Sequence, residues 1–111
     1  MKLIHSLVRT SKLDDVKSAL CRLNVRGLAT IEMKDHSPQE HPTGVWRGQP
    51  YRLDFTPKAW LELVVDDDDV DDVVTTIIAT ARTGQAGDGH VCVIPLEHRY
   101  EIRTGARGAS D

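Results

Sequence analysis

The sequence predicts an α+β fold with a four-stranded antiparallel sheet and both helices on one face of it. Segments with strand and helix periodicity follow one another in the order strand, helix, strand, strand, helix, strand. The 111 residues leave room for one domain, at 1–111. Because such a sheet leaves its second face uncovered, we also expect copies of the chain to associate through that face.

The first part of the chain predicts two strands with a helix between them. Residues 3–9 form an apolar run of strand length. The helix that follows should have Ser11 as its N-cap and Asp14 and Asp15 in its first turn, since apolar residues then recur at helical spacing. Apolar and polar residues alternate over 25–34, which predicts a strand with one buried face.

A segment rich in proline and glycine separates the two halves. Residues 35–50, DHSPQEHPTGVWRGQP, contain three prolines and two glycines, which argues against a strand interior or a regular helix. We therefore expect a long exposed loop. Loops of this length are usually functional or disordered, so the segment matters for function. Strand patterns return at 51–55 and 60–65.

The acidic run DDDDVDD at 66–72 has two interpretations, a calcium or magnesium site and the opening of a helix. We favour the helix, because carboxylates are stabilised near the unpaired N–H groups of a first turn and an apolar stripe follows over 70–81. Gly84 should end this helix, with a strand at 91–96 and room for a short last one at 100–103. The complete order is that of ferredoxin-like folds.

Composition limits the classes of function. Fourteen Lys and Arg against seventeen Asp and Glu give a net charge of −3, which argues against binding nucleic acid or an anionic membrane. The two cysteines show no CxxC spacing, so neither a disulfide framework nor a metal site is expected. No window has the roughly 20 apolar residues of a membrane span, and the start of the chain does not resemble a signal peptide. We expect a cytoplasmic protein that inserts into no membrane, holds no prosthetic group and is not an enzyme.

The clearest local motif is TGQAGDGH at 83–90, a glycine-dense turn between a helix and a strand. It matches neither the P-loop nor the dinucleotide fingerprint. Glycine N–H groups can form a concavity that binds anions, but such clusters are more often plain turns. Arg103 and Arg107 in IRTGARG at 102–108 could clamp the same anion. The residues alone leave phosphate binding and a structural turn both open.

Four motifs, in order and over nearly the whole chain, resemble those of the PII nitrogen-regulatory signal transduction proteins: KLDDVKSAL at 12–20, RGQPYRLDFTPK at 47–58, ARTGQAGDG at 81–89 and IRTGARG at 102–108. The resemblance implies a compact homotrimer that binds ATP or ADP between subunits, with 2-oxoglutarate joining magnesium-bound ATP. It also implies a T-loop, here about 35–57, that acts on an ammonium channel, an enzyme or a regulator. A C-terminal segment would occupy 97–111.

The resemblance also implies three groups of functional residues. The nucleotide site would comprise Ala29, Pro38, Glu62, Val64, Gly87, Asp88, Gly89, His90 and Arg103. Magnesium and 2-oxoglutarate would be bound by Gln39, Lys58 and Arg9. In the T-loop, Tyr51 stands where some members are nucleotidylated. Trp46 and Arg47 are candidates for contact with a partner, since aromatic residues are enriched at interface hot spots; the alternative for Trp46 is packing against its own subunit.

The phosphate side departs from the family pattern, because His90, Glu101 and Pro38 stand where the family has basic residues. A charge-assisted hydrogen bond contributes about 1.5–3 kcal/mol, so the loss of two would weaken ATP binding by roughly two to four decades.

Two principal functions remain open. One is a nitrogen or related metabolic sensor that binds an adenine nucleotide, with ADP or AMP preferred. The other is a divergent member that has lost ATP and 2-oxoglutarate sensing and responds to another ligand, or acts as a constitutive protein-interaction module. An enzyme acting on phosphate esters is a third hypothesis, supported only by the glycine turn and Arg103.

Overall fold

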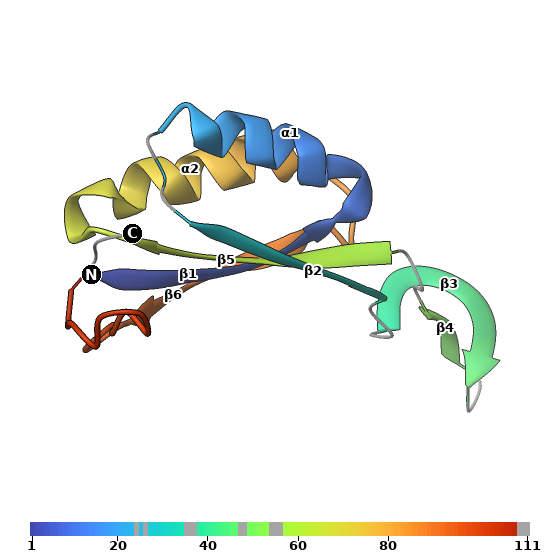
Figure 1. The fold of residues 1–111 in the computed structure, drawn as a ribbon. Coiled ribbons are helices and arrows are strands. Elements are labelled where there is room, and N and C mark those ends of the chain that lie inside the picture. The colour runs from blue at the N-terminus through green and yellow to red at the C-terminus, as the bar shows by residue number, and fades with distance from the viewer. Residues whose placement is uncertain (24, 26, 35–37, 47–48, 54–56, 109–111) are drawn as a thin grey trace.

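The computed structural model describes residues 1–23, 25, 27–34, 38–46, 49–53 and 57–108. Two helices cover one face of a four-stranded sheet, and a two-stranded ribbon projects from one end of that sheet (Figure 1). The strand order is β2-β5-β1-β6, and every neighbouring pair is antiparallel. The predicted mixed fold, with two helices on one face of an antiparallel sheet, is confirmed.

Each half of the chain contributes one strand–helix–strand unit, and the ribbon is inserted between the two units. The elements in chain order are β1 (Lys2–Arg9), α1 (Thr10–Cys21), β2 (Leu28–Lys34), β3 (Pro38–Trp46), β4 (Gln49–Leu53), β5 (Pro57–Val65), a 3-10 turn (Asp67–Asp69), α2 (Val70–Ala81) and β6 (Gly89–Pro95).

The core lies between the sheet and the helices. Alternate residues of the two central strands are buried toward the helices, among them Ile4 and Val8 of β1 and Leu61 and Leu63 of β5. They pack against the buried faces of α1 and α2, which contribute Leu13, Val16, Leu20, Val73, Ile77 and Ala81. Burial of one such aliphatic side chain contributes roughly 1.5–3 kcal/mol, so this layer holds the fold together.

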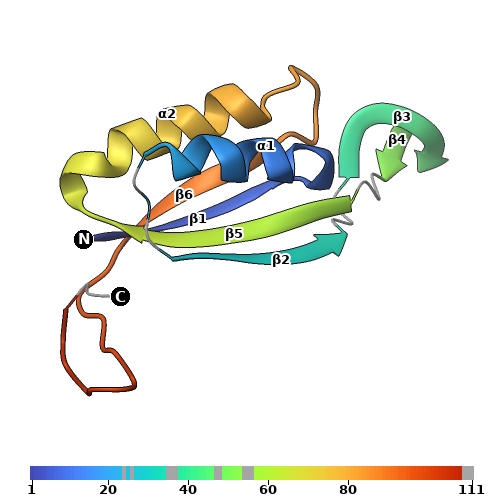
Figure 2. The ribbon, with the colours of Figure 1, turned by 45° about the horizontal axis from the view of Figure 1, so that its top comes forward.

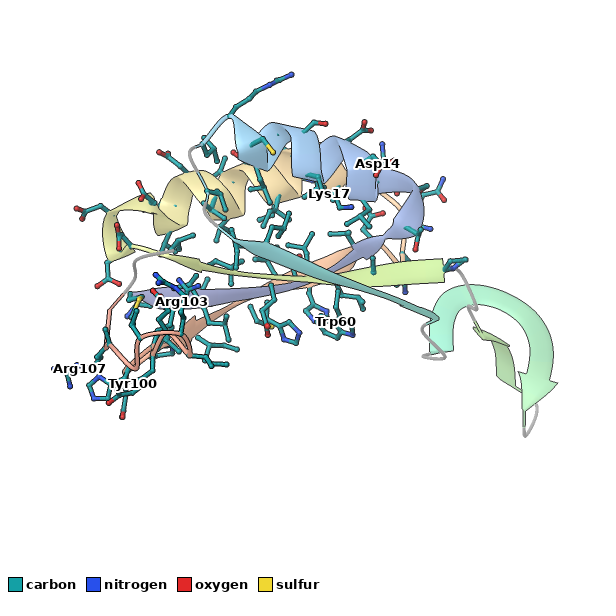
Figure 3. The ribbon with its side chains drawn as sticks, in the orientation of Figure 1. Asp14, Lys17, Trp60, Tyr100, Arg103 and Arg107 are labelled. Carbon is teal, nitrogen blue, oxygen red and sulfur yellow. The ribbon has the colours of Figure 1, made fainter. Side chains whose placement is uncertain are left out.

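The opposite face of the sheet carries no helix among the described residues, as Figures 1 and 2 show from two directions. We call it the open face. Trp60 points to this side, away from the helices, in Figure 3. Strand register places alternate residues of the strands on it, among them Leu3, His5 and Leu7 of β1, Trp60, Glu62 and Val64 of β5, and His90, Cys92 and Ile94 of β6.

The prediction for the start of α1 was wrong. Arg9 is its N-cap residue and retains an extended backbone, and no side-chain hydrogen bond caps this helix in the described part of the chain. Strand β1 runs directly into α1, so the helix begins where the strand ends and Ser11 already lies inside it. Asp14 and Asp15 consequently fall beyond the first turn.

The acidic run opens α2, as the helix interpretation predicted. A 3-10 turn over Asp67–Asp69 precedes the helix, whose first turn contains Asp71 and Asp72. At the other end, α2 stops at Ala81 and is followed by an extended Arg82, so Gly84 lies in the next turn and is not the helix cap. The short strand at 100–103 is replaced by a single bridge between Tyr100 and Arg107.

The expectation of a loop without strands at 35–50 was also wrong. β3 pairs with β4 in antiparallel register, with a shift of register between Gln39 and Gly44. An isolated ribbon has two outer edges, so a proline can face outward without breaking a ladder hydrogen bond, and a bulge absorbs further mismatch. Residues 35–37, 47–48 and 54–56 lie outside the described residues.

Candidate functional site

The glycine-rich turn at 83–89 joins α2 to β6 at the end of the sheet where β1 finishes. Gly84, Gly87 and Gly89 have φ of +87°, +93° and +97°, in the left-handed region that favours glycine. Gly89 is the most constrained of the three, because a Cβ atom there would lie 1.9 Å from the carbonyl oxygen of Leu7. Only glycine therefore lets β6 start this close to β1.

Asp88 holds the turn together from within. Its carboxylate accepts hydrogen bonds from the backbone N–H groups of Thr83, at 2.8 Å, and Gly84, at 3.0 Å, and from the Thr83 hydroxyl. Partial burial acts to raise the pKa of Asp88, but the hydrogen bonds from Thr83, Arg9 and Gly84 outweigh it and hold this pKa well below the usual range. Asp88 is thus an ionised residue that fixes the shape of the turn, and its carboxylate is engaged within the chain.

Arg9 connects this turn to β1. Its Nε donates to Oδ1 of Asp88 at 3.1 Å, and its Nη2 donates to the carbonyl oxygen of Ala86 at 2.8 Å. Lys58 of β5 is the register partner of Arg9 and is only 1% exposed. The structure therefore brings Arg9, Lys58 and the predicted Gly87–Gly89 triplet together at one end of the sheet.

The ribbon leaves the sheet at this same end. Lys34, the last residue of β2, pairs with Pro57, the first of β5, next to the pair of Arg9 and Lys58. Four predicted site residues, Pro38, Gln39, Trp46 and Tyr51, lie on the ribbon backbone, and Ala29 lies on β2. The structure does not describe their side chains, and Arg47 lies outside the described residues.

Three further predicted residues lie along the open face. Glu62 is exposed and sits between its register partners Ala29 and His5. Val64 is half-buried and lies two residues farther from the turn, opposite Leu3. His90 is exposed and follows Gly89 directly.

The aromatic contacts made by Trp60 were not foreseen from the sequence. Its ring stacks on that of His5, with centroids 4.1 Å apart, and meets His90 edge-on at 5.4 Å. Trp60 has the same alternation phase as Glu62, so strand periodicity could have placed it on the open face. That three separate strands bring these rings together depends on register, which periodicity does not give.

Arg103 lies at the opposite end of the sheet from the glycine turn. The C-terminal segment follows Pro95, which pairs with Lys2, whereas Gly89 pairs with Val8. The seven residues of β6 separate these two ends by roughly 20 Å. Figure 3 shows Arg103 near the N-terminus, and Figure 2 shows the segment projecting from the sheet.

Arg103 is 83% exposed and pairs with Glu101 at 3.1 Å. Within one chain the turn and Arg103 therefore lie at opposite ends of the sheet, and the clamp of one anion by both remains a prediction. The described residues contain no group of three or more His, Cys, Asp and Glu arranged to hold a metal ion. No described helix is long and apolar enough to cross a membrane.

Similarity to known proteins extends over nearly the whole chain. The family model described as "Nitrogen regulatory protein P-II" matches residues 1–106. The Nitrogen regulatory protein P-II 1 of Escherichia coli K12 is 43% identical over 105 residues, which cover 95% of this chain and 94% of that protein. The same identity and coverage are found for Nitrogen regulatory protein P-II 1 of Salmonella typhimurium LT2 and Nitrogen regulatory protein P-II of Klebsiella oxytoca.

Proposed function

Since this chain belongs to the P-II nitrogen regulatory protein family, we propose that it binds an adenine nucleotide between the subunits of a homotrimer and controls a partner protein through a T-loop at 35–57. Regulatory signalling is the role of the family, whose members form trimers and interact with partner proteins. The ligand, the cytoplasmic location and the use of the T-loop in this chain are part of the proposal.

The observation that carries the proposal is the distance between the glycine turn and Arg103. The turn is fixed by Asp88 and Arg9 at one end of β6, while Arg103 follows the other end of this strand, on a projecting segment. A second copy could present its own Arg103 to the turn of the first. Ile102, next to Arg103, is 100% exposed in the chain alone, which also favours burial of this segment against another copy.

The ion pairs near the site favour nucleotides with few phosphates. Glu101 pairs with Arg103 and would repel a triphosphate, and Arg9 is bonded to Asp88 and Ala86. We therefore propose a preference for ADP or AMP over ATP. We propose no binding of magnesium and 2-oxoglutarate, because Arg9 already donates to Asp88 and to the carbonyl oxygen of Ala86.

Calorimetric titration with ATP, ADP and AMP, with and without magnesium and 2-oxoglutarate, tests this function. We expect heat of binding for at least one nucleotide, with ADP or AMP binding no more weakly than ATP. Sedimentation of the same sample should give the mass of three chains. The absence of heat for all three nucleotides at millimolar concentration would contradict the proposal.

A second candidate function is a divergent member that responds to another ligand or acts as a constitutive interaction module. Two ion pairs favour this candidate: Arg9 pairs with Asp88, and Arg103 pairs with Glu101. Both arginines are thus engaged with carboxylates of their own chain. In that case Trp46→Ala should abolish capture of a partner, and nucleotides should have no effect on capture. Nucleotide-dependent capture would exclude this candidate.

A further inference from the structure

A groove runs between α2 and β6, the outermost strand at one side of the sheet. It has a volume of about 310 Å³, and the residues that line it include Val74, Ile78, Ala81 and Arg82 of α2, Val8 of β1 and Val91 of β6. Because Val8 and Val91 pack toward the helices, these walls lie on the helix side of the sheet and not on the open face. Ile78 remains 41% exposed, so α2 leaves apolar surface uncovered here.

The C-terminal segment carries an apolar side chain that nothing in its own chain covers. Ile102 is 100% exposed. It stands in a loop at 99–108, which we call the terminal loop. The bridge between Tyr100 and Arg107 closes this loop, together with backbone hydrogen bonds of 2.8, 2.9 and 3.0 Å. Single exposed aliphatic side chains are common, but a loop that is ordered before binding loses little conformational entropy when such a side chain is buried.

The groove and the terminal loop lie apart within one chain. The groove adjoins the end of β6 that begins with Gly89, and the terminal loop follows Pro95 at the other end. Figure 2 shows the segment projecting away from the helices. A contact between the loop of one copy and the groove of another joins two different surfaces, so it is heterologous. Repeated contacts of this kind form a ring where the rotation closes, as it does in a trimer.

The charges beside the two surfaces are complementary. Glu101 and Arg103 flank Ile102 and pair with each other at 3.1 Å. Arg82 and Asp88 both line the groove. Glu101 of one copy can therefore face Arg82 of the next, while Arg103 faces the ionised Asp88. Complementarity of this kind fixes the register of a contact more than its strength.

We propose that the terminal loop of one copy docks in the α2–β6 groove of the next, with Ile102 as its apolar anchor, and that this contact closes the ring of three chains. The inference rests on the trimer of the proposed function and names a contact that holds it. The groove has roughly ten times the ~30 Å³ of a water molecule, enough for an aliphatic side chain and part of its loop. Ile102 and Ile78 are then buried together.

Sedimentation over a range of protein concentrations, without nucleotide, compares Ile102→Asp with Ile102→Leu. Aspartate brings a charge into an apolar groove, whereas leucine keeps the apolar volume. Both variants should fold, because Ile102 is fully exposed in the chain, and circular dichroism checks this. We expect Ile102→Asp to raise the concentration at half-dissociation at least tenfold, and Ile102→Leu to stay close to wild type.

A second pair of variants tests the groove. Ile78→Asp changes its wall, and Thr75→Asp is the control, since Thr75 is exposed on the same helix and is not among the residues that line the groove. Ile78→Asp should weaken the trimer at least tenfold, and Thr75→Asp should leave it unchanged.

A disulfide between chains locates the contact directly. In a Cys21→Ser and Cys92→Ser background, Ile102→Cys combined with Ile78→Cys should give linked dimers and trimers on a denaturing gel after mild oxidation. A disulfide needs Cβ atoms about 3.5–4.5 Å apart, so Ile102→Cys combined with Thr75→Cys should give none.

Three results would overturn the inference while the trimer stands: sedimentation of Ile102→Asp like wild type, the same for Ile78→Asp, and equal cross-linking through positions 78 and 75. An intact Ile78→Asp trimer would leave the groove to another occupant. Nucleotide binding by an intact Ile102→Asp trimer would overturn the inference and support the proposed function. A wild-type chain that sediments as a monomer would contradict both.

Discussion

At Gly89 the backbones of β6 and β1 approach so closely that a single methyl group would not fit. We predict that Gly89→Ala destabilises the fold by about 2–4 kcal/mol, because the new Cβ meets the Leu7 carbonyl and alanine disfavours a φ of +97°. Urea unfolding measures the change.

Gly84→Ala is the matched control for that substitution. Gly84 has a similar φ of +87°, but a Cβ there would meet nothing within 4 Å. Its cost should be about 1–2 kcal/mol, from backbone strain alone. Equal destabilisation by the two alanines would show that the close contact with Leu7 contributes nothing.

Asp88 should make the stability of the chain depend on pH. Its pKa is lowered in the folded state, so the unfolded chain takes up the proton first as pH falls. The contribution of Asp88 is then fully present above the ordinary carboxyl pKa near 4 and is lost progressively below it. We predict that Asp88→Asn costs about 2 kcal/mol at pH 7 and that the difference from wild type shrinks below pH 4.

Urea unfolding of both proteins between pH 7 and pH 3 measures this effect. Asp67→Asn serves as a control, since the pKa of Asp67 is also lowered, mainly by a hydrogen bond from the N-terminal amine, but its ion pairs are exposed. The Asp67 change should be much smaller. A difference between wild type and Asp88→Asn that stays constant down to pH 3 would contradict the role of Asp88.

Among the elements, the β3–β4 ribbon is separable from the sheet. Lys34 and Pro57 are register partners at its base, so a two-residue turn can join them. We predict that replacing 35–56 with Asn-Gly leaves a folded chain whose melting temperature shifts by less than about 5 °C, equivalent to about 1 kcal/mol. Circular dichroism measures the melting, and partner capture should be lost. An unfolded product would mean that the ribbon is part of the folding unit.

Elements with a regular apolar periodicity were predictable from the sequence. Elements that depend on pairing with another strand were not. The alternation of β5 and the apolar stripe of α2 gave their types and buried faces correctly. The ribbon was missed, because its three prolines argue against strands unless a bulge and two free edges are known. The start of α1 was misplaced, because no capping residue marks a helix that continues directly from a strand.

The candidate site was predictable only where its residues are neighbours in the chain or lie at a strand end. Gly87, Asp88 and Gly89 form one motif, and the structure adds the contact of Arg9 with Asp88. The contact of Trp60 with His5 and His90 needs the register of three strands. The remoteness of Arg103 needs the order of the whole sheet, which no local pattern contains.

At the scale of the whole molecule, two positions at which this chain lacks the basic residues that the resemblance implies lie at opposite ends of the sheet. His90 begins at the glycine turn, and Glu101 lies in the C-terminal segment. We predict that His90→Lys and Glu101→Arg each raise ATP affinity by roughly one to two decades, since each adds a charge-assisted hydrogen bond in the proposed cleft between subunits. Calorimetry with ATP measures both.

The control for added charge is Thr75→Lys, on the exposed side of α2. It changes the net charge as His90→Lys does but lies away from the proposed cleft, so ATP affinity should stay the same. An equal gain from Thr75→Lys would indicate a general charge effect and would remove the support for a shared phosphate site.

The placement of the glycine turn and Arg103 beyond opposite ends of β6 has a consequence for how this protein responds to its own abundance. In the proposed assembly a complete cleft exists only while chains are associated. A nucleotide bound in the cleft therefore stabilises the oligomer. Dilution would then lower the apparent affinity for the nucleotide, and saturating nucleotide would delay dissociation. A cell that made less of this chain would therefore lower the apparent affinity of the protein for its nucleotide, with no change in the residues of the cleft.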